Sequence, residues 1–112
     1  MPDDLTFAVM IDSQLGESEL LRMLVDGLAE ARLFGGYIKY RRNVLKLERN
    51  SLHDEVKAST RDDKSWMYFR YSLNVFPEGE TSLVEQKSLA SSVLAMLDEA
   101  GLTPELVSEF DL

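Results

Sequence analysis

Apolar residues recur along this chain with two different spacings, and the order in which those spacings follow one another limits the fold. Alternation of apolar and polar residues, or a short continuous apolar run, predicts a β-strand. Apolar residues spaced three to four apart predict an amphipathic helix. The segments predicted as strands are residues 6–11, 37–49, 66–76 and 105–112, and those predicted as helices are residues 17–33 and 82–100.

The order strand, helix, strand, strand, helix, strand is the split βαβ pattern. Ser82 and Glu85 match a capping box at the start of the second helix, and Gly101 matches a C-terminal stop signal. We therefore expect a two-layer, ferredoxin-like α+β sandwich, with a mostly antiparallel sheet and two helices on one of its faces. The length of 112 residues fits one such domain, spanning residues 1–112.

The middle of the chain leaves its strand layout open. The alternation within residues 37–49 loses phase at Arg41, Arg42 and Asn43, which indicates either one kinked strand or two short strands joined by a tight turn. Residues 50–65 are polar and rich in charge, so we expect a long surface loop there. A short extended piece at residues 55–58 is compatible with that loop.

The chain has no cysteine and one histidine, His53, and this restricts its chemistry. A disulfide scaffold, a thiol nucleophile and a metal site of cysteines or several histidines are excluded. The sequence also lacks a phosphate-binding glycine loop and a nucleophile elbow. The remaining candidates, Asp12-Ser13 and His53-Asp54-Glu55, are more typical of a turn and a solvated loop. We therefore expect a non-enzymatic protein with no metal and no cofactor.

The net charge of −8 is unevenly distributed. Residues 1–36 carry 2 basic and 7 acidic side chains, residues 37–76 carry 9 and 5, and residues 77–112 carry 1 and 8. Either neighbouring elements neutralise one another, or the molecule presents separate acidic and basic surfaces, one of them a docking site. The overall acidity disfavours nucleic acid as a partner and favours a basic protein.

Two predicted strands carry side chains suited to binding a protein. The outer face of residues 66–76 is aromatic and cationic, a composition enriched at interface hot spots, and the strand of residues 105–112 is acidic. A loop or a second copy of the chain covering the aromatic side chains is the competing interpretation. The candidate partner-binding residues are Trp66, Tyr68, Arg70, Glu105, Glu109 and Asp111.

The second half of the chain has a recognisable layout. An acidic loop, an aromatic strand, a helix and an acidic-aromatic tail follow one another over about residues 53–112. The residues that carry it are His53-Asp54-Glu55, Trp66 to Tyr71, Pro77, Gln86, Leu89-Ala90, Leu97, Gly101 and Glu109-Phe110-Asp111. This layout resembles small acidic bacterial immunity proteins of polymorphic or contact-dependent toxin systems. The resemblance implies a cytoplasmic, non-enzymatic inhibitor that binds a toxin domain, and it assigns no role to an individual residue.

Three functional hypotheses follow from the sequence. The first is an immunity or antitoxin-type inhibitor of a basic toxin. The second is a ferredoxin-like homodimer that binds a small molecule on its sheet face, with or without enzymatic activity. The third is a protein that sequesters a DNA-binding partner by mimicking phosphate. The acidic start at residues 1–4 and the absence of an apolar run of about 20 residues predict a cytoplasmic location with no membrane contact.

Overall fold

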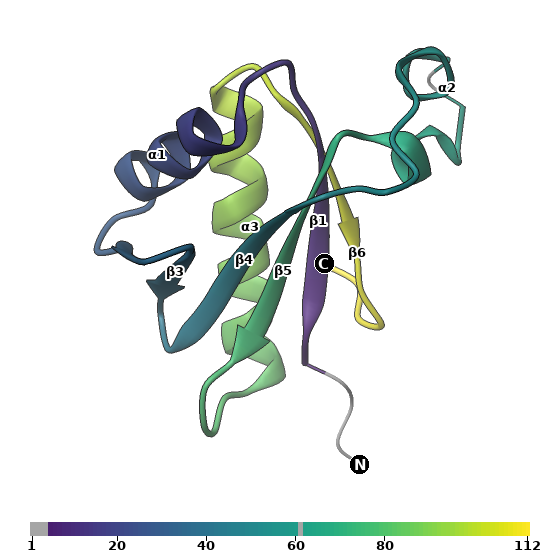
Figure 1. Ribbon diagram of the computed structural model, residues 1–112. Coiled ribbons are helices and arrows are strands. Elements are labelled where there is room, and N and C mark those ends of the chain that lie inside the picture. The colour runs from purple at the N-terminus through teal and green to yellow at the C-terminus, as the bar shows by residue number, and fades with distance from the viewer. Residues whose placement is uncertain (1–4, 61) are drawn as a thin grey trace.

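The computed structural model, which describes residues 5–60 and 62–112, is built on a six-stranded sheet with strand order β2-β3-β4-β5-β1-β6 (Figure 1). Each strand pairs antiparallel with its neighbours. The predicted α+β class with an antiparallel sheet is therefore confirmed. The acidic residues 1–4 used in the localisation argument lie outside the described residues. The strands are β1 (Phe7–Asp12), β2 (Arg32–Phe34), β3 (Tyr37–Tyr40), β4 (Asn43–Arg49), β5 (Tyr71–Pro77) and β6 (Thr103–Val107).

Two helices, α1 (Glu17–Gly27) and α3 (Leu83–Glu99), pack against the same face of this sheet. Their apolar stripes and the alternate residues of the central strands form one buried cluster. The helices also touch each other closely, because a Cβ added at Gly27 would lie 2.8 Å from Met96. The core residues with no exposed surface include Val9, Ile11, Leu20, Leu24, Ile38, Leu45, Tyr71, Leu73, Val75, Val93 and Leu97.

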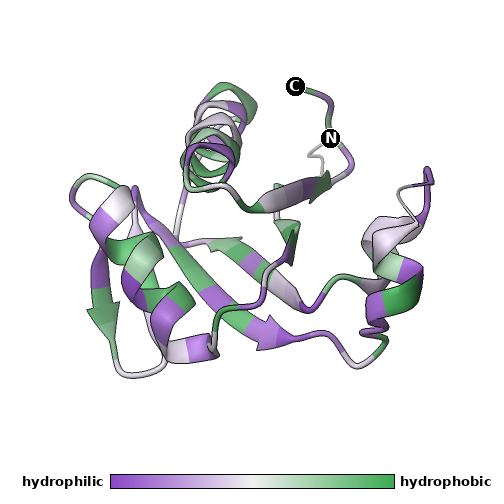
Figure 2. Cartoon of the chain, turned by 90° about the horizontal axis from the view of Figure 1, so that it is seen from above, coloured by the Kyte–Doolittle hydropathy of each residue, from purple (hydrophilic) through white to green (hydrophobic). Residues whose placement is uncertain are grey.

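A short helix, α2 (Glu55–Ser59), and a single 3₁₀ turn, η1 (Ser65–Tyr68), stand well apart from α1 and α3 (Figures 1 and 2). The prediction of an extended piece at residues 55–58 is therefore wrong, because these residues are helical. Asp54 starts α2, since its side chain accepts hydrogen bonds from the backbone N–H groups of Val56 and Lys57.

The predicted strand of residues 66–76 is also wrong in its first half, because pairing with β4 begins only at Tyr71. The physical reason is Asn50, whose side-chain amide donates to the carbonyl oxygens of Met67 and Phe69, both at 2.8 Å. These bonds hold the preceding backbone in η1 and take it out of the sheet.

Two other boundaries differ from the sequence prediction, and one question that the sequence left open is answered. The first helix ends at Gly27, and the residues that follow form β2, a short strand that pairs with β3. The open question about residues 37–49 is settled in favour of two strands, β3 and β4, joined at Arg41 and Arg42. The last strand is Thr103–Val107, an edge strand that tolerates Pro104 because a strand edge leaves N–H groups unpaired.

Candidate functional site

The face of the sheet opposite α1 and α3 is covered only in part. Along strands β2 to β5, every second side chain points to this open face. Phe34 and Phe76 are two of these side chains, and their exposed fractions are 44% and 43%. Tyr37 stacks on Phe34, and Lys39 lies over the same ring, 5.3 Å from its centre. The open face therefore combines aromatic surface with cationic side chains.

One corner of the open face is covered by α2 and η1. A small buried cluster of Met10, Ala58 and Phe69 forms there, and Trp66 and Tyr68 pack against it half-buried. Each of these two predicted binding residues therefore exposes part of its side chain to solvent. Lys57 lies over the Tyr68 ring, 4.9 Å from its centre, which adds a cation to the same corner.

Arg70 makes two contacts within the fold. Its guanidinium pairs with Glu55 at 3.6 Å, and it donates a hydrogen bond of 3.4 Å to the Gln14 carbonyl oxygen. These contacts link α2 to the loop after β1. The sequence grouping of Arg70 with Trp66 and Tyr68 on one strand face does not apply, since those two residues lie in η1.

The acidic candidates at the C-terminal end lie on or beside β6. Glu105 is exposed and pairs in register with Met10, next to the α2–η1 corner. Glu109 and Asp111 are exposed on the tail that follows, and Phe110 between them is buried, packing edge-on against Phe7 at 5.7 Å. The tail is thus anchored, and its carboxylates are presented to solvent.

Ion pairing between the acidic and basic parts of the molecule is sparse. Within residues 5–60 and 62–112, the ion pairs are Lys39 with Glu78 at 3.7 Å and Arg70 with Glu55. No ion pair within the described chain involves the acidic side chains of α1, α3, β6 or the C-terminal tail. The presence of separate acidic and basic surfaces, one of them a docking site, stays a prediction.

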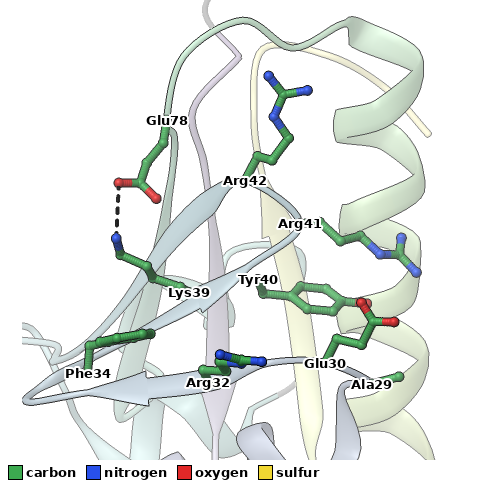
Figure 3. A pocket seen from close by; sticks show the side chains of 9 residues that line it. All are labelled: Ala29, Glu30, Arg32, Phe34, Lys39, Tyr40, Arg41, Arg42 and Glu78. Carbon is green, nitrogen blue, oxygen red and sulfur yellow. Dashed lines mark ion pairs between the residues drawn. The ribbon is translucent and has the colours of Figure 1, made fainter.

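A basic hollow with a volume of about 460 Å³ lies at the opposite end of the sheet, where β2, β3 and the β3–β4 turn meet (Figure 3). Figure 3 shows Lys39 pointing to Glu78, and Arg41 reaching over Tyr40 toward α3. Sequence analysis singled out Arg41 and Arg42 only as a break in the strand alternation, and it missed the residues from other segments that line the hollow with them. The hollow is lined by Ala29, Glu30, Arg32, Phe34, Lys39, Tyr40, Arg41, Arg42 and Glu78.

The acid–base candidates of the sequence have structural roles. Asp54 caps α2, Glu55 pairs with Arg70, and the backbone N–H of His53 bonds to Asn50. Ser13 lies buried in the turn after β1, where its hydroxyl accepts a hydrogen bond from the Leu15 backbone. Across the described chain, no three His, Asp or Glu side chains are grouped to hold a metal ion. None of the helices in that part of the chain is both long and apolar enough to cross a bilayer.

Comparisons with protein-family models, with curated proteins and with solved structures found no match to this chain.

Proposed function

We propose that this chain is a non-enzymatic protein-binding domain that inhibits a basic partner, most concretely a bacterial toxin neutralised by direct binding. The observation that carries the proposal is the group of exposed carboxylates on β6 and the C-terminal tail. Glu105, Glu109 and Asp111 are exposed and form no ion pair within the described chain. A surface of this kind steers a basic protein toward it and raises the association rate.

The predicted binding residues support a docking region around the α2–η1 corner and β6. Glu105, Trp66 and Tyr68 lie on or beside the same side of the sheet, because Val107 of β6 packs into the cluster that the two aromatic residues border. Half-buried aromatic side chains next to exposed carboxylates supply both apolar contact and charge complementarity. Glu109 and Asp111 extend the acidic rim along the tail.

We also propose that the fold is a ferredoxin-like sandwich enlarged by the β2–β3 hairpin. Without that hairpin and the α2–η1 segment, the elements follow one another as β1, α1, β4, β5, α3 and β6. This is the split βαβ order. The hairpin extends the sheet beyond β4 and supplies four of the nine residues that line the basic hollow, Arg32, Phe34, Lys39 and Tyr40.

The test is affinity capture of the tagged protein from its native host at low and at high salt, followed by binding kinetics with the captured protein. We expect a basic partner that is retained at low salt and released at high salt. The triple variant Glu105→Gln, Glu109→Gln, Asp111→Asn should then lower the association rate about tenfold. Glu17→Gln with Glu85→Gln is a control away from β6. An acidic partner, or binding indifferent to salt, would overturn the proposal, and equal effects of both variants would move the docking region elsewhere.

A second candidate function is a homodimer that binds a small molecule on its sheet face. The exposed rings of Phe34 and Phe76 on the open face favour it, because a second copy would bury them. Sedimentation equilibrium of the full chain decides between the candidates. A monomer at concentrations of about 100 μM excludes the dimer, since stable homodimers associate more tightly than that.

A further inference from the structure

A groove with a volume of about 680 Å³ runs between α1 and α3, and we call it the α1–α3 groove. Figure 1 shows α1 beside the end of α3 that leads into β6, which is where this groove lies. Its floor includes Leu15, Met23 and Met96, three half-buried side chains that pack against the main core. The groove therefore presents to solvent an apolar surface that is continuous with the core.

Gly27 makes room for Met96 on the floor of the groove. Gly27 is exposed on α1, and a Cβ added there would lie 2.8 Å from the Met96 side chain. A larger residue at this position would displace Met96. Methionine side chains are flexible and polarizable, and for that reason they are common on surfaces that adapt to an apolar ligand. The floor of the groove, with Met23 and Met96, is of this kind.

The rim of the groove carries carboxylates on both sides. Glu19 and Asp26 lie two helical turns apart and so share one face of α1, and Glu99 lines the groove from α3. Arg22 is the one cationic side chain among the described residues of the lining, and it forms no ion pair within residues 5–60 and 62–112. Three carboxylates and one guanidinium give the lining a net charge of −2.

Two of these carboxylates lie where a helix disfavours them. Asp26 is in the last turn of α1 and Glu99 is in the last turn of α3, and neither turn contains a basic residue. The C-terminal end of a helix carries partial negative charge, so it repels an acidic side chain and attracts a cation. Natural sequences break such local rules at functional sites. Both exceptions occur at the same groove, and both favour a cationic ligand.

The groove continues toward the start of β6. A second hollow, of about 620 Å³, shares Leu15 and Met23 with it and reaches Asp12 and Thr103. The described residues of this extension include no lysine or arginine. The two hollows together form an elongated depression, a shape that fits a segment of polypeptide better than a compact small molecule. None of the predicted binding residues lines either hollow, so this site is separate from the docking region proposed above.

We propose that the α1–α3 groove binds a basic amphipathic helix of a protein partner. Such a helix lays its apolar stripe into a hydrophobic groove, here against Met23 and Met96. Lysine or arginine side chains on the two sides of the stripe meet Glu19 and Asp26 on one rim and Glu99 on the other. The inference does not rest on the proposed inhibitor function, because it concerns other residues and any protein that carries such a helix.

The test is titration of the full chain, labelled at the methionine methyl groups, with a synthetic amphipathic peptide of leucine and lysine. A length of about 14 residues lets the peptide form a helix. We expect saturable shifts of the Met23 and Met96 methyl signals. The signals of Met10 and Met67 should stay unchanged, because these residues lie at the α2–η1 corner. Two control peptides of the same length, one with glutamate in place of lysine and one of lysine alone, should give no saturable shift.

Two matched double variants test the charge of the rim. Asp26→Asn with Glu99→Gln should weaken binding of the leucine–lysine peptide about fivefold, since two exposed ion pairs are lost. Glu17→Gln with Asp98→Asn removes the same charge from the same two helices at exposed positions outside the groove, and it should bind as the unaltered protein does. Equal weakening by both double variants would mean that the peptide responds to overall charge, and it would overturn the proposal.

A further variant separates binding from folding. Ala100 lies exposed in the groove at the C-terminal end of α3, where a lysine suits the helix end. Ala100→Lys should therefore unfold at the same temperature or higher and yet lose peptide binding, because it places a cation in the groove. Unchanged binding by this variant, or no saturable shift of Met23 and Met96, would overturn the proposal. Shifts of Met10 and Met67 in their place would also overturn it, and would locate the basic peptide in the docking region proposed above.

Discussion

The two faces of the sheet differ in what holds them together. The face under α1 and α3 is a continuous apolar core to which most of the strands and both long helices contribute. The open face has one small buried cluster, Met10, Ala58 and Phe69, and elsewhere carries exposed aromatic and charged side chains. The same strands supply both faces, since adjacent residues point to opposite sides.

This difference separates stability from recognition. Burial of apolar surface is the main favourable term in folding, and here it is concentrated on the covered face. The open face contributes little to that term, so its side chains are free to serve binding. Substitutions on the two faces should therefore have unequal effects on the free energy of unfolding.

The largest loss is expected for Leu24→Ala. Leu24 lies on α1, has no exposed surface and belongs to the main core. Removing its side chain leaves a cavity between helix and sheet, and such substitutions cost about 2–5 kcal/mol. The measurement is urea denaturation followed by circular dichroism. Glu17→Ala on the same helix, an exposed position, is the control, and a loss for Leu24→Ala no greater than that of the control would contradict the assignment of α1 to the core.

Sequence periodicity was sufficient for the elements that bury a regular face. The continuous apolar run of β1 and the helix that starts at the Ser82 cap were both predicted, and Ser82 does accept a hydrogen bond from the Glu85 backbone. The α+β class with an antiparallel sheet follows from those elements. Periodicity is a local property, and in these segments the local pattern and the tertiary packing agree.

Sequence periodicity gave wrong predictions where contacts with residues distant in the sequence determine the backbone conformation. Residues 66–70 continue the alternation of β5, yet the side chain of Asn50, 17 residues before Met67, holds them in η1. The strand β2 has only three residues and none of them is buried, so it carries no periodic signal of its own. Pairing with β3 across the Gly35–Gly36 turn defines it.

The candidate sites were predictable only in part. Arg41 and Arg42 stood out as a break in the alternation, but the basic hollow also needs Arg32 and Glu78 from distant segments. The hydrogen-bond partner of the Asn43 side chain, Gln86, is 43 residues away, so this buried pair has no local signature. The binding roles assigned to Trp66, Tyr68, Arg70, Glu105, Glu109 and Asp111 remain predictions.

An intermediate loss is expected for Gln86→Ala. This substitution leaves the buried amide of Asn43 and the Leu5 carbonyl oxygen without their partner, which costs about 1–3 kcal/mol. The same denaturation experiment measures it, with the exposed Ser91→Ala on α3 as the control. In a double-mutant cycle, adding Asn43→Ala should cost less than it does in the unaltered protein, because the pair is already broken. Additive losses would show that the two amides act independently.

The smallest effect is expected for Phe76→Thr, and it is the most direct comparison of the two faces. Val75 and Phe76 are neighbours on β5, but Val75 has no exposed surface whereas Phe76 is 43% exposed. Threonine keeps the β-branched preference for a strand, so at position 76 the free energy of unfolding should change by no more than about 0.5 kcal/mol.

The matched substitution Val75→Thr has nearly the same shape as the original residue and places a hydroxyl in the apolar core, which costs about 1–3 kcal/mol. The two variants have the same strand and the same new residue, and both are measured by denaturation. The difference between their free energies of unfolding therefore reports the effect of the sheet face on which each residue lies. A loss at position 76 equal to that at position 75 would mean that Phe76 is buried in solution. A second copy of the chain would then be the natural cover, and the loss should shrink as the protein is diluted, since dilution dissociates a dimer.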